Sequence, residues 1–369
     1  MNLNNYKEMK FIDEYRDTEL IGKLSRAIKR KATGNYTFME VCGGHTAAIH
    51  RFGIPSLLSK NIKLISGPGC PVCVTGKKYI DTAIALSRLN GMIITTFGDL
   101  LRLPGSFSSL EKEKAAGADV RIVFSGLDAL EIAKANPERK VVFLGVGFET
   151  TAPGTAITVL QAKKEKLNNF FLLGSHKIMP PAMETVISQG VRIDGFICPG
   201  HVAAITGADA FRFIPDKYRL GCVISGFEPA DILQSVLMLV DQVNERSPSV
   251  EIQYRRAVTP GGSISGKKFL AEVFELFNDE WRGLGVIPLS GLRLRGEYGR
   301  YDASKVFSVE VKSLDDNKLC ICGDILRGVK IPPECRLFGS SCSPENPYGA
   351  CMVSSEGACN AYYKFGKNE

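Results

Sequence analysis

The sequence predicts an α/β fold made of two related open parallel-sheet domains that flank a cleft. Between residues 38 and 230, short apolar or β-branched runs alternate with helical stretches and glycine-rich turns, as in α/β proteins. Several runs lack alternation, which is typical of buried parallel strands. A chain of 369 residues with 44% apolar residues is also long for a single hydrophobic core, so we expect two or three folded domains.

The expected elements follow one another along this region. The strands are 62–66, 92–96, 120–124, 141–144, 170–173 and 221–224. The helices, which carry apolar residues at three- and four-residue spacing, are 79–89, 127–135 and 155–166. Several strands end in loops rich in Gly, Pro, Cys, Glu or Asp, and open α/β sheets bind their ligands at this carboxyl edge.

Two nine-residue segments, 41–49 and 197–205, share six identical positions. This internal echo predicts two related domains, one with the loop at Cys42 and the other with the loop at Cys198, and an active-site cleft between them. The expected division is an N-terminal helical segment 1–37 with a helix at 18–29, a first α/β domain 38–137, a second α/β domain 138–310 and a cysteine-rich tail 311–369. We expect the tail to pack with the N-terminal helical segment.

Composition limits the classes of function. Eleven cysteines without a signal-peptide pattern indicate metal binding or redox chemistry, since cytosolic surroundings would reduce disulfides. The first eight residues are polar and charged, and no apolar run approaches the roughly 20 residues of a membrane span, so we expect a soluble cytoplasmic protein without a membrane partner. The net charge of +7 is spread through the chain, which argues against a nucleic-acid partner. No glycine-rich phosphate-binding motif is present, so any nucleotide chemistry would belong to a partner.

Residues 67–73 have the sequence Gly-Pro-Gly-Cys-Pro-Val-Cys and place a C-x-x-C pair, Cys70 and Cys73, between a strand and a helix. The exposed amides and the dipole of a helix N-terminus favour the thiolate, and two sulfurs at this spacing can form a reversible disulfide. A structural zinc site would need a second pair nearby, yet the next cysteine is Cys198. These observations favour a redox or iron-binding role over structural zinc or inert thiols.

Cys42 is followed by two glycines and His45, so a thiol and an imidazole lie three residues apart in a loop that permits close backbone approach. Such residues could ligate a metal jointly or act as nucleophile and base. A cysteine and a histidine that only pack in the loop fit the motif equally well.

The tail contains six cysteines between Cys320 and Cys359. Four of them are separated by twelve, six and sixteen residues, namely Cys322, Cys335, Cys342 and Cys359. Zinc fingers take their ligands as two close pairs, so these wide, unequal gaps favour an iron-sulfur cluster over zinc or disulfides. Bound metal would help to order a segment so rich in glycine and proline.

Several blocks of the sequence together resemble the HypD family of hydrogenase maturation factors, and the resemblance covers nearly the whole chain. In chain order the blocks are 40–46 (Glu-Val-Cys-Gly-Gly-His-Thr), 67–73, 96–99 (Thr-Phe-Gly-Asp), 104–106 (Pro-Gly-Ser), 147–153 (Gly-Phe-Glu-Thr-Thr-Ala-Pro), 198–202 (Cys-Pro-Gly-His-Val), 225–229 (Ser-Gly-Phe-Glu-Pro) and 338–359, which ends in Ala-Cys-Met-Val-Ser-Ser-Glu-Gly-Ala-Cys. So many blocks in the expected order make the resemblance specific.

The resemblance implies a [4Fe-4S] cluster whose ligands are Cys322, Cys335, Cys342 and Cys359. Cys320 and Cys351 then lie outside the ligand set as buried thiols. By the same resemblance, Cys42 is the iron ligand of an assembling Fe(CN)₂CO group, which it holds together with a cysteine of a small HypC-type chaperone.

The resemblance also implies that Cys70 and Cys73 are a redox-active thiol pair near the cluster, and that a HypE-type partner delivers cyanide as a cysteine thiocyanate. Release of the cyanide to iron takes two electrons. A cluster passes electrons singly and a dithiol holds two, so the two groups together would form a one-to-two-electron converter.

Further candidates lie in the same loops. His45 could be a second iron contact or a proton donor near cyanide, or could only fix the loop. Cys198 and His201 either face the same cleft or form a structural helix start. Glu356 could hydrogen-bond within the tail. Three carboxylates in glycine-rich loops could position ligands or could simply be solvated, namely Asp99, Glu149 and Glu228.

Three functions are consistent with these patterns. The leading one is a redox-active scaffold for the maturation of [NiFe] hydrogenases. The second is a cluster-dependent thiol-disulfide oxidoreductase that acts through Cys70 and Cys73 and does not need Cys42. The third is a zinc-stabilised binding module in which the cysteines only order the tail.

Overall fold

The computed structural model describes residues 9, 10 and 12–366. The polar N-terminal octapeptide, on which the expectation about targeting depends, lies outside the described residues, as do parts of the expected segments 1–37 and 311–369. None of the described helices combines the length and the apolar composition of a membrane-spanning segment.

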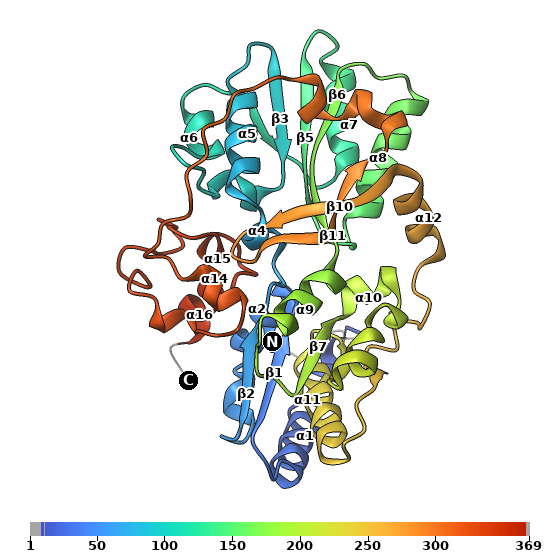
Figure 1. Ribbon diagram of the computed structural model, residues 1–369, viewed down its shortest axis with the longest axis vertical. Helices are drawn as coiled ribbons and strands as arrows, with labels where there is room; N and C mark the ends of the chain where they lie inside the picture. The colour runs from blue at the N-terminus through green and yellow to red at the C-terminus, as the bar shows by residue number, and fades with distance from the viewer. Residues whose placement is uncertain (1–8, 11, 367–369) are drawn as a thin grey trace, which may run out of the picture.

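The described chain forms two sheets (Figure 1). The first sheet has the strand order β2-β1-β7-β8-β9 and is parallel throughout, with bounds β1 Tyr36–Glu40, β2 Ile62–Ser66, β7 Gly195–Pro199, β8 Gly221–Ser225 and β9 Val250–Ile252. The second sheet has the order β10-β11-β6-β5-β3-β4, with bounds β3 Met92–Thr96, β4 Val120–Ile122, β5 Lys140–Gly147, β6 Phe170–Lys177, β10 Phe274–Trp281 and β11 Gly285–Leu294. Its strands β3 to β6 are parallel, and β10 and β11 add an antiparallel hairpin beside β6. The predicted α/β class is confirmed.

The two sheets are not built from consecutive stretches of chain. The first sheet combines 36–66 with 195–252, and the second combines 92–177 with 274–294. The expected boundary between residues 137 and 138 therefore falls inside the second sheet, and the expected domains 38–137 and 138–310 do not correspond to the sheets. The reason is that strands distant in the sequence pair with one another, which periodicity along the chain cannot indicate.

The internal echo marks two neighbouring units of one sheet rather than two domains. Strands β1 and β7 pair in parallel, with Phe38 opposite Gly195. Each is followed by a short loop and a helix, so the loops at Cys42 and Cys198 leave the first sheet side by side. The expectation that they belong to separate domains is wrong.

Helices connect most of these strands. Their bounds are α1 Thr18–Lys31, α2 Gly43–Arg51, α3 Ile54–Leu57, α4 Pro71–Val74, α5 Lys77–Ser87, α6 Leu110–Ala115, α7 Gly126–Ala135, α8 Ala152–Lys164, α9 Met179–Ser188, α10 Gly200–Thr206, α11 Pro229–Asn244, α12 Ile264–Val273, α13 Ala303–Val306, α14 Cys322–Leu326, α15 Ala350–Val353 and α16 Ala358–Phe365. Local signals explain several starts. Asp17 caps α1, and Ser125 and Asp128 form a capping box at α7. Helix α8 begins before the expected residue 155 because Pro153 fits the first turn of a helix.

The buried core accounts for the non-alternating strands. Residues 141–144 of β5 are 0% exposed, because helices and loops cover both faces of the second sheet. On the first sheet, α1 and α11 pack against each other and share a core with β1 and β8.

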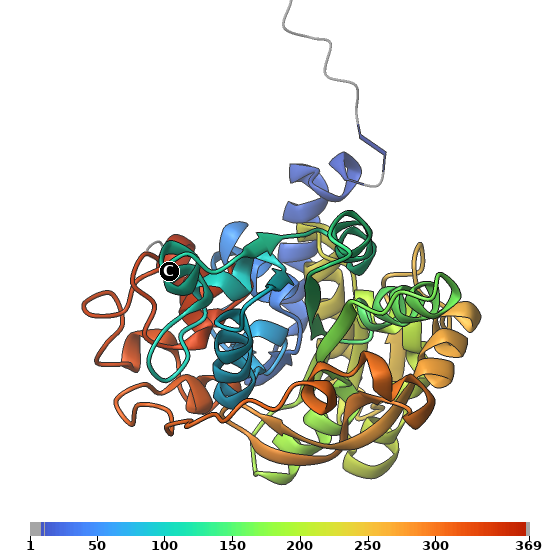
Figure 2. The ribbon, with the colours of Figure 1, turned by 90° about the horizontal axis from the view of Figure 1, so that it is seen from above.

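The cysteine-rich tail packs on α2 and α4, which follow β1 and β2 (Figure 1). Helix α16 lies on α2 and α15 lies on α4, whereas α1 packs on α11. The expected packing of the tail with the helix at 18–29 is thus corrected: the apolar face of α1 is taken by α11, and the tail covers the carboxyl edge of the first sheet. Seen from above, the tail and α12 lie on opposite sides of the molecule (Figure 2).

Candidate functional site

A cavity of about 530 Å³ lies where the carboxyl ends of strands from both sheets approach one another. Loops that follow β1, β2, β3, β4, β5 and β7 line it, together with residues of the tail. Among the residues singled out from the sequence, the cavity wall includes Cys42, Asp99, His201 and Glu356. The sequence predicted a cleft between a domain with Cys42 and a domain with Cys198; the cavity lies instead between the two sheets, and Cys198 is not part of its wall.

Cys42 is held by a buried carboxylate that the sequence analysis did not single out. Cys42 follows β1 and is the N-cap residue of α2. Its backbone N–H donates to Glu40 Oε2 at 3.0 Å, and the other oxygen of Glu40 accepts from the Thr46 hydroxyl. Glu40 is 1% exposed, and burial raises its pKa to about 8. A glutamate at the end of an otherwise apolar strand was the only sequence signal for this role.

The environment keeps Cys42 as a thiol in the absence of metal. Burial, and then the carboxylate of Glu356, raise the pKa of Cys42 to about 12. Binding of a metal ion releases such a proton, since only the thiolate is a ligand. A bound metal cation would therefore favour ionisation of Cys42, since it stabilises the thiolate that burial disfavours.

Two histidines sandwich Phe227. His45 stacks on this ring at 4.5 Å between centroids and His201 stacks on it at 3.9 Å, so the imidazoles must take opposite faces. His45 is 0% exposed, and its Nε2 donates to the Gly226 carbonyl at 2.9 Å. Burial lowers the pKa of His45 to about 4 and also lowers that of His201.

These contacts separate the roles of the two histidines. The imidazole of His45 bonds the Gly226 carbonyl and is absent from the cavity wall, so this side chain fixes the loop after β8 against α2, while the His45 backbone lies beside the Cys42 sulfur. His201 lines the cavity and is the imidazole that can meet a bound group. Phe227, which positions both rings, carried no sequence signal beyond its place in the block 225–229.

Cys70 and Cys73 form a disulfide at the short helix α4, with their Cα atoms 5.2 Å apart. Both are buried, and Cys70 Sγ accepts from the N–H of Cys73 at 3.2 Å. The preceding Gly69 packs on the backbone of Cys42, where an added Cβ would lie 2.2 Å from the Cys42 nitrogen. The N–H of Gly43 also donates to the Gly69 carbonyl at 2.9 Å. Gly69, the residue directly before Cys70, therefore contacts the backbone of Cys42.

The tail gathers sulfur atoms around the start of α14. Cys320 Sγ and Cys322 Sγ are 3.3 Å apart, and the neighbouring thiols of Cys322 and Cys359 lower the pKa of Cys351. Cys342 Sγ accepts from a backbone N–H at 3.3 Å. Cys335 Sγ instead contacts the carbonyl of Leu319 at 3.9 Å, beside Cys320. Thiolates are soft ligands, so this group of thiols fits a soft metal or an iron-sulfur cluster.

The arrangement does not single out the expected four ligands. Cys351 is 0% exposed, as expected of a buried thiol, yet its sulfur interacts with those of Cys322 and Cys359. Cys320 likewise contacts Cys322. Within the described residues, no three potential ligands are placed to hold a metal ion as they stand.

The tail also reaches the cysteine pair and the cavity. Cys73 Sγ lies 3.9 Å from the carbonyl oxygen of Ala350, the neighbour of Cys351. Farther along, the Ser354 hydroxyl donates to Asp99 Oδ2 at 2.6 Å. Glu356 then packs on α2 so closely that a Cβ at Gly43 would lie 2.4 Å from its Cβ. Glu356 therefore faces the cavity instead of bonding only within the tail.

The other candidates stabilise the fold outside the cavity wall. Glu149 is 2% exposed and accepts from the N–H of Met179 at 2.9 Å, at the start of α9. Glu228 pairs with Arg16 at the start of α11, and Cys198 is buried within β7. Each is near a cavity loop, but none of the three lines the cavity.

Comparison with known proteins gives matches over nearly the whole chain. The sequence model of HypD, described as the hydrogenase formation hypA family, matches residues 19–366. The chain is 48% identical to hydrogenase maturation factor HypD2 of Bradyrhizobium diazoefficiens and 47% identical to HypD of Azotobacter vinelandii, in each case over 97% of both chains. It is 45% identical to HypD of Escherichia coli over 98% of this chain and 99% of the relative.

Proposed function

The chain belongs to the HypD family of hydrogenase maturation factors, and on this basis we propose that it is a redox-active scaffold on which the Fe(CN)₂CO group of [NiFe] hydrogenases is assembled. The observation that carries the proposal is a succession of contacts between three sulfur sites. The loop of the Cys70 and Cys73 disulfide packs on Cys42, and Cys73 contacts the tail at Ala350.

The iron under assembly is the cargo, and Cys42 is its ligand. A thiolate is a soft ligand that suits low-spin iron carrying cyanide and carbon monoxide. A cavity of about 530 Å³ exceeds the needs of such a group, which leaves room for a ligand from a partner. His201 and Glu356 face the same space and can donate or accept hydrogen bonds around the diatomic ligands.

A small HypC-type chaperone would supply the second cysteine at the mouth of this cavity. Ile122 and Phe124 line the cavity and are 50% and 93% exposed. Such exposed apolar side chains beside a functional cavity suit a protein partner that covers the cargo.

The cysteine pair supplies the electrons for cyanide release. In the balanced reaction, the dithiol form of Cys70 and Cys73 and the cysteine thiocyanate of a HypE-type partner give the disulfide, the partner's free thiol and hydrogen cyanide. The pair loses two electrons and two protons, and the thiocyanate accepts both electrons as its carbon–sulfur bond breaks. The iron at Cys42 then binds the cyanide.

The tail would hold a [4Fe-4S] cluster through Cys322, Cys335, Cys342 and Cys359. Such a cluster supplies electrons one at a time. The thiols gathered around the start of α14 support this assignment, and Cys351 is close enough to the sulfurs of Cys322 and Cys359 to be tested as a ligand.

The redox step is tested with reduced protein and a peptide that carries a cysteine thiocyanate. We expect one hydrogen cyanide released for each Cys70–Cys73 disulfide formed. Cys70→Ser should abolish both, whereas Cys198→Ser, which changes a buried cysteine of β7, should leave both unchanged. Cyanide release by Cys70→Ser at the normal rate would contradict the proposal.

A thiol-disulfide oxidoreductase is the second candidate, and the formed disulfide beside the tail is the observation that favours it. It predicts that Cys42→Ala reduces a protein disulfide as fast as the wild type and has no defect in hydrogenase maturation. The scaffold proposal predicts complete loss of maturation in that variant.

A further inference from the structure

Arg282 lies in the turn between β10 and β11, where the hairpin meets both the cysteine pair and the tail. Its backbone N–H donates at 2.9 Å to the carbonyl of Val74, the last residue of α4. The next residue, Gly283, packs so closely on Gly323 that an added Cβ would lie 2.7 Å from the Gly323 Cα. Arg282 is therefore fixed between the helix of the C-x-x-C pair and the start of α14, where Cys322 lies.

The guanidinium of Arg282 is buried and only partly paired. Nε and Nη2 donate to the carboxylate of Asp316 at 2.9 and 2.6 Å, and the side chain is 8% exposed. Nη1 is buried and has no hydrogen-bond partner among the residues that the structure describes. Leaving a charged donor unpaired in the interior is costly, so this N–H is suited to an acceptor of negative charge.

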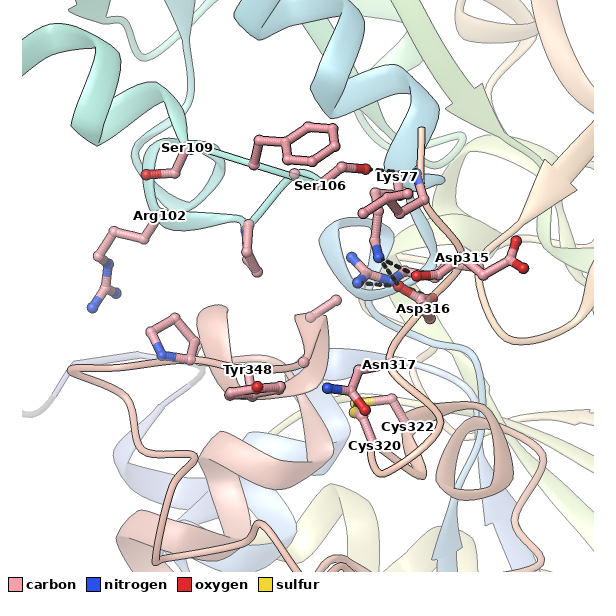
Figure 3. A pocket seen from close by; sticks show the side chains of 18 of the residues that line it. Lys77, Arg102, Ser106, Ser109, Asp315, Asp316, Asn317, Cys320, Cys322 and Tyr348 are labelled. Atoms are coloured by element: carbon pink, nitrogen blue, oxygen red, sulfur yellow. Dashed lines mark hydrogen bonds and ion pairs between the residues drawn. The ribbon is translucent and has the colours of Figure 1, made fainter. Parts of the chain in front are cut away.

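The sulfur atoms of Cys320 and Cys322 share a cavity with Arg282. Arg282, Cys320 and Cys322 line one cavity of about 830 Å³, and Figure 3 shows Asp316 on the same side of it as the two cysteines. Burial opposes the charge of Arg282, but Asp316 and then the sulfurs of Cys322 and Cys351 outweigh it and raise its pKa. The guanidinium is therefore near enough to these sulfurs for its charge to stabilise a negative charge on them.

The charge of Arg282 is not fully cancelled by its carboxylate. Asp316 also accepts from Lys77 Nζ at 3.2 Å, so one carboxylate serves two cations. The three groups leave a net positive charge beside the sulfurs.

We propose that Arg282 donates a hydrogen bond from Nη1 to a sulfur of the iron-sulfur group held by the tail, and that its charge stabilises the reduced form of that group. The inference rests on the proposed cluster. Reduction adds one negative charge to such a group, and hydrogen bonds and positive charge around the sulfurs raise its reduction potential. Arginine suits this role because two of its N–H groups can bind Asp316 while a third stays fixed toward the sulfurs.

The test is a redox titration of the anaerobic full-length protein, followed by electron paramagnetic resonance. In Arg282→Gln we expect iron and sulfide contents of the wild type and a tenfold lower equilibrium constant for reduction, which equals a midpoint about 59 mV more negative. Arg282→Lys keeps the charge and should shift less. The matched control is Arg293→Gln, which removes an exposed arginine paired with Glu275 on the same hairpin and should leave the midpoint unchanged.

A second variant gives the opposite sign. Asp316→Asn removes a negative charge and leaves Arg282 in place, so its midpoint should become more positive. An Arg282→Gln protein with the iron and sulfide content of the wild type and an unchanged midpoint would overturn the inference. If Arg282→Gln loses its iron, the Asp316→Asn variant decides: an unchanged or more negative midpoint there would overturn the inference. Wild-type protein without iron and sulfide would instead refute the proposed cluster itself, which separates the two failures.

Discussion

Replacing Gly69 by alanine is expected to separate the loop of the cysteine pair from Cys42. The added Cβ would lie 2.2 Å from the backbone nitrogen of Cys42 and 2.5 Å from its Cα. Backbone atoms cannot swing aside as the end of a flexible side chain can, so the two loops must move apart. Overpacking of a tight interior lowers the free energy of unfolding by about 1–3 kcal/mol, and we expect about 3 kcal/mol here because the clash is with backbone atoms.

This cost can be measured by calorimetry. At about 2.1 cal/mol/K per residue, a loss of about 3 kcal/mol lowers the melting temperature of a 369-residue chain by about 4 °C. Gly98→Ala is the matched control, since Gly98 lines the same cavity and a Cβ there meets no atom within 4 Å. We also expect Gly69→Ala to retain the iron of the tail and to lose the cyanide and carbonyl infrared bands. Equal melting temperatures and equal infrared bands in the two variants would refute the reasoning.

Three further predictions follow from the contacts described. Cys42→Ala should keep the fold and the iron and sulfide of the tail, measured chemically, and lose the low-spin iron of the cargo; loss of the cluster signal would contradict the separate roles. Burial raises the pKa of Glu149 to about 7, so the folded state binds this proton more tightly than the unfolded chain does. Proton binding therefore stabilises the folded state fully below about pH 4.5, and this stabilisation is lost as the pH rises through 7. Relative to the wild type, Glu149→Gln should therefore gain roughly 2 kcal/mol in free energy of unfolding between pH 5 and pH 8, measured in urea; a constant difference would show that Glu149 does not titrate this way. An added Cβ at Gly349 would lie 2.6 Å from two cysteine sulfurs, so Gly349→Ala should lower the iron and sulfide content by half or more, whereas Gly296→Ala, with open space around it, should not; equal contents would exclude crowding of the metal site.

The sequence predicted the strands best where an apolar run was bounded by turn residues. The strands 62–66 and 92–96 have the predicted bounds. Strand 92–96 is buried throughout and is an unbroken apolar or β-branched run, whereas in 62–66 the apolar residues are interrupted by the exposed Lys63. Strand β1 was missed because its last residue, Glu40, is a buried carboxylate that interrupts this pattern. The hairpin of β10 and β11 was missed because polar residues interrupt the apolar residues of β10, and both Leu276 and Asn278 are exposed.

The pairing of strands could not be read from local patterns. The echo between 41–49 and 197–205 correctly marked two similar units, but similarity alone does not say whether such units form separate domains or neighbouring strands. Only the contact between β1 and β7 decides this, and it joins residues more than 150 positions apart.

Candidate site residues could be predicted from the sequence where the residue type itself is reactive, as for cysteine. Thiols are reactive, so the spacing of the C-x-x-C pair indicated a redox or iron-binding role, whereas the role of Cys42 rested on the resemblance to a family; the structure places them in adjacent loops. Phe227 and Arg282 could not be named, because an aromatic ring and an arginine are ordinary residues until their long-range neighbours are known. The role of His45 also depends on a long-range neighbour. The motif suggested an iron contact or a proton donor, but the imidazole bonds the backbone carbonyl of Gly226 away from the cavity.

Infrared and Mössbauer spectroscopy of the anaerobic protein, alone and mixed with the proposed small chaperone, test the central claim most directly. We predict four irons with four sulfides in the tail, one further low-spin iron with cyanide and carbonyl bands, and loss of that iron and those bands alone in Cys42→Ala. Cyanide and carbonyl bands that persist in Cys42→Ala, or protein that holds zinc without sulfide and never shows these bands, would contradict the account.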